Sequence, residues 1–341
     1  MRFALAFMAA MLALSASAAA APQARVEFLS REAVVGWVDN YRLKPEPARL
    51  PGAVRALSKA GALRDPENAG FHVGFIAAVL GSNPASAEAM VGRMLPLPVS
   101  DQWAVVRAIA YSGLPEWQRL LRRIAPRLPA RQAMIDQYLA GSLPTLDAIE
   151  LDKSPSFLEK MQMHLGVKET GPEVSFGKNP ELLDTFWGQY FATGDYQPVY
   201  RILTMLPWSK DRDSVDRLVV GSMAKVTLAN NATSYPDLLH MLKHKAKYQS
   251  AEVAAPLNEV IQAAETVQAP RLKKQALAAI EEIRRKGPGY KREMTVWGTV
   301  GQGAIALGCI AAAVVSLTAA GIPCVVGGAV TSAALSYWAA Q

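Results

Sequence analysis

The C-terminal segment of the chain, residues 294–341, contains no charged side chain. So long an apolar segment is stable in a lipid bilayer or inside a protein, because exposing it to water costs free energy in proportion to its area. Its first run, 296–317, is long enough at 1.5 Å per residue to cross a hydrocarbon layer of about 30 Å. A turn predicted at Gly321 and Pro323 precedes the second run, 324–340. The sequence therefore predicts an apolar helical hairpin that is a membrane segment.

Small residues recur every four positions in both runs of this hairpin. They are Ala304, Gly308, Ala312 and Ser316 in the first, and Gly328, Ser332 and Ser336 in the second. Such strips let two helix backbones pack closely in lipid, so we predict that these residues form the helix–helix contact. Two features count against this prediction. The tail is rich in Ala and Gly, which weakens its insertion. Export would also place the basic segment 271–293 outside the cytoplasm, whereas basic residues beside membrane helices tend to lie on the cytoplasmic side. A hairpin buried in the fold, or shielded by oligomerisation, therefore remains an alternative.

Cys309 and Cys324 are the only cysteines, and both lie in the tail. A turn at Gly321 places Cys324 opposite about Thr318, and Cys309 is about 13 Å farther along. A disulfide needs Cα atoms within about 7 Å, so this hairpin predicts two thiols that are not bonded to each other. The rest of the chain has no disulfide framework and depends on burial for its stability.

Residues 1–21 have the pattern of a cleaved signal peptide. Arg2 supplies a positive charge, an apolar run follows at 3–14, and the small residues at 15–18 fit a peptidase site. A retained anchor is the alternative, although the run is short for one. We expect an exported protein of the bacterial periplasm or cell envelope, associated with a membrane. An exported chain with a formal net charge of only +7 is not expected to bind nucleic acid.

The segment between these ends shows helical periodicity throughout. In 180–193 the apolar positions follow i, i+3, i+4, i+7 and i+8 spacing, which predicts one apolar stripe on a helix. Pro180 suits the first turn and Gly194 suits a left-handed stop. The residues of the stripe are Leu183, Phe186, Trp187, Tyr190 and Phe191.

Three more helices are predicted near 101–112, 115–124 and 130–140, with Gly113 and Gly141 after the first and third. In the second of them Arg119, Arg122 and Arg123 face outward. Sixteen prolines between Pro45 and Pro207 limit helix length, and no stretch alternates with a period of two. The predicted fold is all-α: an irregular, solenoid-like stack of short antiparallel helices with the apolar hairpin at its C-terminus.

Glycines mark a weak repeat with a period of about 30 residues, which is within the range of helical repeat proteins. Gly81, Gly113 and Gly141 follow one another at intervals close to this period. A helix, a small-residue turn and a second helix in such a period resembles the tetratricopeptide-like architecture, over residues 30–250. The consensus residues of that family do not recur. The resemblance implies stacked helices with a concave contact face, and a compact, non-repeating helical domain is the alternative.

The chain divides at 166–178, where Gly171, Pro172 and Gly177 interrupt the periodicity. We predict a repeat-like helical domain over 22–165 and a second helical segment over 178–286. The latter ends in a basic helix, since 271–293 carries eight positive against three negative residues.

Candidate chemistry is sparse, and no metal, cofactor or catalytic residue is predicted. His240 and His244 have metal-ligand spacing, but lysines surround them, so an exposed polar helix face is preferred. Ser222 and Lys225 match S-x-x-K without its companion motifs. Aromatic residues at helical spacing usually form core. Alternatively, one such set could line a groove for a peptide or lipid: Phe186, Trp187, Tyr190 and Phe191.

These features together predict a non-catalytic envelope protein. Its helical body would be a protein-interaction scaffold for an unknown protein partner, tethered to membrane lipid through 294–341. One alternative is a membrane-perturbing factor whose Gly-rich hairpin inserts in lipid. The other is a periplasmic hydrolase with no recognisable motif.

Overall fold

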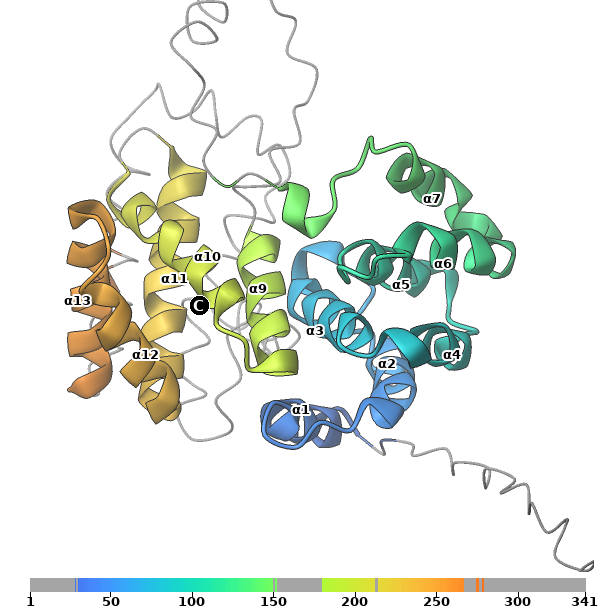
Figure 1. The fold of residues 1–341 in the computed structure, drawn as a ribbon, viewed down its shortest axis with the longest axis horizontal. Coiled ribbons are helices and arrows are strands. Elements are labelled where there is room, and N and C mark those ends of the chain that lie inside the picture. Colours follow the sequence, from blue (N-terminus) through green and yellow to red (C-terminus); the bar gives the residue numbers. More distant parts are fainter. Residues whose placement is uncertain are drawn as a thin grey trace, which may run out of the picture.

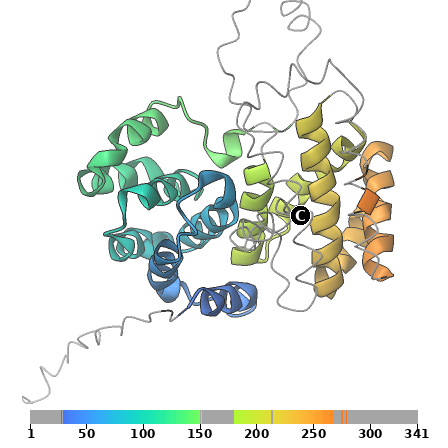
Figure 2. The ribbon, with the colours of Figure 1, turned by 180° about the vertical axis from the view of Figure 1, so that it is seen from behind.

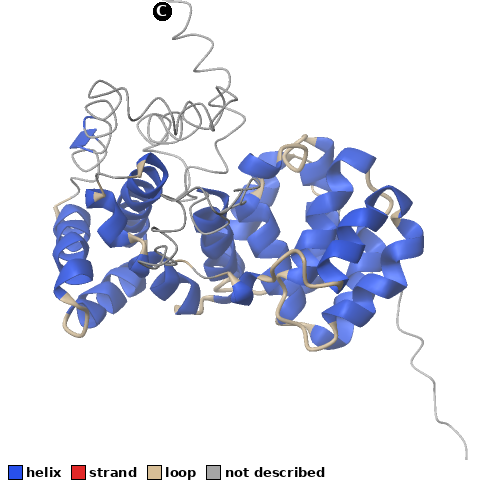
Figure 3. Ribbon diagram, turned by 90° about the horizontal axis from the view of Figure 1, so that it is seen from above, coloured by secondary structure: helices blue, strands red, loops and turns tan. Residues whose placement is uncertain are grey.

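A computed structural model of the protein describes residues 30–149, 180–211 and 214–266, together with Phe28, Leu151 and three positions between 274 and 278. These residues form twelve α-helices joined by short 3-10 turns, and they contain no strand (Figure 3), which confirms the predicted all-α stack. The predicted signal peptide and the predicted apolar hairpin lie outside the described residues. In the part of the chain that is described, no helix is long and apolar enough to cross a membrane.

The helices fall into two groups along the chain. The first group is α1 (Arg31–Tyr41), α2 (Leu50–Lys59), α3 (Gly70–Gly81), α4 (Pro84–Met94), α5 (Val99–Ala110), α6 (Trp117–Ile124) and α7 (Gln132–Leu139). The second is α9 (Pro180–Thr193), α10 (Gln197–Thr204), α11 (Val215–Ser234), α12 (Pro236–Ala246) and α13 (Ala251–Glu265).

Alternate helices of the first group pack on one another. The contacts run from α3 to α5 and from α5 to α7, and on the outer side from α2 to α4. This gives an inner row of α3, α5 and α7 and an outer row of α2, α4 and α6 (Figure 1). Two rows of antiparallel helices are the arrangement that the weak glycine repeat predicts.

The centre of the molecule is the contact between α3 and α9, which is the most extensive pairing of helices. It lies between the two groups in both Figure 1 and Figure 2. Every residue of α3 from Gly70 to Leu80 is buried. Helices that are apolar all round are stable only when they are enclosed by other elements.

Glycines bring α3 and α9 unusually close. A Cβ atom added at Gly74 would lie 2.0 Å from the Thr185 carbonyl oxygen, and one added at Gly188 would lie 2.1 Å from that of Phe71. The Thr185 hydroxyl also donates a hydrogen bond to the Gly70 carbonyl at 3.2 Å. The segments predicted as 22–165 and 178–286 therefore meet through backbone contact.

Two details differ from the sequence prediction. Helix α9 was expected to bury one stripe, but its whole circumference from Leu182 to Gly188 is buried, since α1, α3, α10 and α11 all pack on it. Gly81, expected in a small-residue turn, is the last residue of α3, and it allows close approach to the Ser112 carbonyl. Gly194 does adopt the predicted left-handed stop after α9, with φ of +71°.

Candidate functional site

Arg42, at the C-terminal end of α1, joins this helix to α12. Its Nη1 and Nη2 atoms donate hydrogen bonds of 2.7 and 3.1 Å to the two carboxylate oxygens of Asp237. The Arg42 side chain is 9% exposed and that of Asp237 is 44% exposed. A planar guanidinium paired with a carboxylate in this bidentate way fixes both distance and orientation.

Aromatic rings surround the Arg42 guanidinium. Its Cζ atom lies 4.7 Å from the ring centroid of Tyr235 and 5.5 Å from that of Tyr190. The Tyr196 hydroxyl donates to Asp237 at 3.2 Å, and the Tyr235 hydroxyl donates to Asp39 on α1. We call these residues the α1–α12 cluster.

The electrostatics of the cluster favour its paired form. Burial tends to raise the pKa of Asp237, but the hydrogen bond and charge of Arg42 outweigh it and hold this pKa below its ordinary value. Burial, followed by the hydrogen bond to Asp39, raises the pKa of Tyr235. At neutral pH the carboxylate is therefore ionised and the phenol is a neutral donor. The two Nη atoms of Arg42 are satisfied by Asp237, although its Nε atom has no hydrogen-bond partner among the described residues, and the pair links α1 to α12.

A second buried pair connects the two groups of helices. Arg107 on α5 forms an ion pair with Glu181 on α9, and both side chains are less than one fifth exposed. The guanidinium also lies 4.9 Å from the Trp103 ring centroid. Burial lowers the pKa of Arg107, yet the Glu181 charge more than compensates. This pair joins α5 to α9. In the sequence these two helices are separated by a segment that includes 152–179, which lies outside the described residues.

The aromatic residues considered for a groove are core residues in the structure. Phe186, Trp187, Tyr190 and Phe191 are all completely buried, and the Trp187 indole donates to the Thr227 hydroxyl at 3.0 Å. They do not line a groove, because helices cover α9 on every side. The small residues predicted to pack the apolar hairpin, Ala304 to Ser336, lie outside the described residues.

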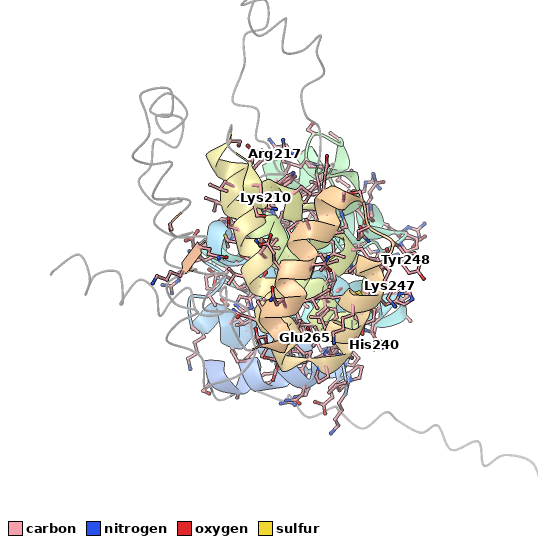
Figure 4. The ribbon with its side chains drawn as sticks, turned by 90° about the vertical axis from the view of Figure 1, so that its left-hand side faces the viewer. Lys210, Arg217, His240, Lys247, Tyr248 and Glu265 are labelled. Carbon is pink, nitrogen blue, oxygen red and sulfur yellow. The ribbon has the colours of Figure 1, made fainter. Side chains whose placement is uncertain are left out.

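The other sequence candidates are separate from one another. His240 and His244 are exposed on α12, and no group of three or more metal-ligating residues occurs in the described part of the chain. Ser222 is buried, while Lys225 Nζ lies 2.5 Å from a carboxylate oxygen of Glu259. Figure 4 shows His240 near Glu265 at one end of this side of the molecule and Lys210 with Arg217 at the other.

The outer row of helices carries a dense set of arginines, which we call the arginine surface. Arg55 lies on α2 and Arg93 on α4, three residues lie on α6, and two lie on the 3-10 turns η3 (Ala125–Arg127) and η4 (Pro129–Arg131). These helices form the edge of the molecule farthest from α13 in Figure 1 and Figure 2. The complete set is Arg55, Arg93, Arg119, Arg122, Arg123, Arg127 and Arg131.

Several of these guanidinium groups are held by backbone carbonyls. Arg127 donates to the Gly92 carbonyl at 3.1 Å and Arg55 donates to the Arg93 carbonyl at 2.5 Å, both in the last turn of α4. Cations at a helix C-terminus satisfy its free carbonyls and interact favourably with the helix dipole. Arg131 donates instead to the carbonyl of Val99, the first residue of α5, at 2.5 Å. These contacts position the arginines without neutralising their charge.

Comparison of the chain with protein-family models, with curated proteins and with solved structures found no match. The fold and the surface of the chain therefore carry the functional argument.

Proposed function

We propose that the protein is an exported, non-catalytic envelope protein whose helical body is an interaction scaffold, held at a membrane by residues 294–341. The observation that carries this proposal is the absence of any charged side chain from that C-terminal segment. Its two apolar runs and their regular small residues suit a hairpin in lipid.

The described body supports the scaffold part of the proposal. Helix α3 of the inner row packs on α9 and joins the two groups of helices, and both groups keep exposed helix faces. Stacked helices of this kind offer an extended surface to a partner, and charged side chains on such a surface set the partner and its orientation. The partner proposed for the body is another protein of the envelope.

A single charge in the tail tests the membrane tether. Leu307 lies at the middle of the first apolar run, and an Asp at such a position costs about 3 kcal/mol of insertion free energy. Leu307→Asp should therefore lower the fraction of full chain that floats with membranes by about 100-fold. Leu43→Asp is the matched control, since Leu43 is 74% exposed on the body. Equal flotation of wild type and Leu307→Asp contradicts the tether.

Deleting 294–341 separates the scaffold from the membrane-perturbing alternative. If the body is a scaffold, the truncated protein leaves the membrane but still crosslinks to the same partners as the full chain. If the hairpin is the active part, the truncated body captures nothing specific, and only the full chain makes vesicles leak. Mass spectrometry of the crosslinked partners identifies what the body binds.

A further inference from the structure

The arginine surface gathers seven positive charges on neighbouring helices and turns of the first group. Seven arginines lie on α2, α4, α6, η3 and η4, and the only acidic residues of these elements and their caps are Glu88 and Glu116. The surface therefore has an excess of five positive charges, not counting Lys59 at the end of α2. A charge excess of this size attracts an anionic partner.

We infer that the arginine surface docks on the anionic phosphate headgroups of the membrane that holds residues 294–341. This inference rests on the proposed function, because it says which side of the body faces that membrane. Arginine suits the task, since its planar guanidinium binds phosphate through two parallel N–H donors and is less strongly hydrated than lysine. A phosphate-bearing surface is the partner that fits both the charge and the residue type.

The arginine surface extends over several elements of the first group. It belongs to the outer row of helices, which faces away from α9, and it is built from several separate elements (Figure 1). Hydrogen bonds from Arg55, Arg127 and Arg131 to carbonyls hold these guanidinium groups in place. A positioned side chain loses less entropy on binding than a free one. Five of the seven arginines are exposed, while Arg55 and Arg131 are partly buried, so several cations are available to headgroups.

The existing ion pairs do not block such contacts. Arg119 pairs with Glu116, and both side chains are more than 60% exposed, while Arg123 and Glu88 are about half exposed. Exposed pairs of this kind contribute little free energy, so a phosphate can replace the carboxylate. Arg122 is exposed and forms no ion pair with any described residue.

The connection to the tail permits this orientation. In the sequence, the stretch 267–293 joins the last turn of α13 to the charge-free segment. A chain of this length reaches at most about 90 Å, which is enough for the arginine surface to meet the bilayer. Proteins that combine an apolar anchor with a basic patch attach to membranes more stably than proteins with either feature alone.

The test compares two double variants of the full chain by flotation with vesicles. Arg119→Gln/Arg122→Gln removes one paired and one unpaired exposed cation from the arginine surface. The control Lys243→Gln/Lys247→Gln does the same on α12, where Lys243 pairs with Glu265. The vesicles contain phosphatidylcholine with or without anionic phosphatidylglycerol. Thermal unfolding of each variant verifies that the body remains folded.

We expect wild type to prefer the anionic vesicles. Each cation near such a surface contributes roughly fivefold, so the arginine variant, which lacks two, should lose about 25-fold of this preference and the lysine variant very little. Raised salt should abolish the preference. Equal losses in the two variants, or no preference in wild type, overturn the inference.

Three further outcomes are distinguishable. If the chain binds soluble polyglutamate through the arginines but shows no preference for anionic vesicles, the partner of the arginine surface is an acidic protein and not lipid. A wild-type chain that fails to float with neutral vesicles contradicts the membrane tether itself. A chain that floats with neutral vesicles, but whose anionic preference does not depend on the arginines, contradicts only this inference.

Discussion

Arg42 connects parts of the chain that are 195 residues apart, through its bidentate pair with Asp237. Neither residue belongs to a motif, and no local periodicity relates them. Sequence reasoning therefore missed the α1–α12 cluster, because only the three-dimensional packing of α1, α9 and α12 brings these residues together. A weak signal existed in the tyrosines at positions 190, 196 and 235, which are well suited to pack around a guanidinium.

The Arg42–Asp237 pair predicts a pH-dependent contribution to stability. The pKa of Asp237 is lowered in the folded protein, so its stabilising effect is fully present above the unfolded-state pKa of about 3.9. The effect is lost as the pH falls through the lower folded-state pKa, because protonation removes the charge that Arg42 binds.

We therefore expect Asp237→Asn to be less stable than wild type by about 1 kcal/mol at pH 7, a fall of roughly 3 °C in melting temperature. The difference should shrink towards zero as the pH is lowered below 4. Asp136→Asn, on the exposed face of α7, is the control and should differ little from wild type at any pH. Thermal unfolding measured across this pH range by circular dichroism checks the prediction, and a difference that does not depend on pH would contradict it.

For single helices, the sequence pattern predicted where each helix lies along the chain better than how much of its surface is buried. The helix predicted over 180–193 is α9 with the same bounds, and the one predicted near 101–112 is α5, displaced by two residues. Apolar spacing, prolines and glycines are local signals, and they are sufficient for locating helices. Full burial of α3 and α9 depends on which neighbours enclose them, and that information is not local.

The contact between α3 and α9 predicts a contrast between two glycines. Gly74→Ala would place a Cβ atom 2.0 Å from the Thr185 carbonyl oxygen, so the two helices must move apart. Overpacking of this kind costs about 1–3 kcal/mol or more. Gly36→Ala is the matched control, because a Cβ atom at Gly36 in α1 has nothing within 4 Å. It should stabilise the protein by up to about 1 kcal/mol through helix propensity.

Urea unfolding of both alanine variants measures this contrast. Opposite signs for Gly74→Ala and Gly36→Ala agree with the glycine-mediated packing of α3 on α9. Equal and small effects would show that the two helices are not held in backbone contact.

For the whole molecule, the described residues form one set of connected helices. Glycine packing between α3 and α9, the ion pair of Arg107 with Glu181 and the α1–α12 cluster all join the first group of helices to the second. The sequence does not predict these connections. A body fixed in this way holds its exposed helix faces in a constant arrangement, which a scaffold needs.

The native thiols test the central claim, the residence of the tail in lipid, most directly. Cys309 and Cys324 are the only cysteines and both lie in 294–341, so maleimide labelling of unmodified protein in membranes reports on this segment alone. A tail in lipid predicts that Cys309 in intact membranes resists even a membrane-permeant maleimide, because a thiol in hydrocarbon does not form the reactive thiolate. Once a non-denaturing detergent replaces the lipid, both thiols should be labelled without prior reduction. Labelling of Cys309 by a charged, impermeant maleimide in intact membranes would contradict the account.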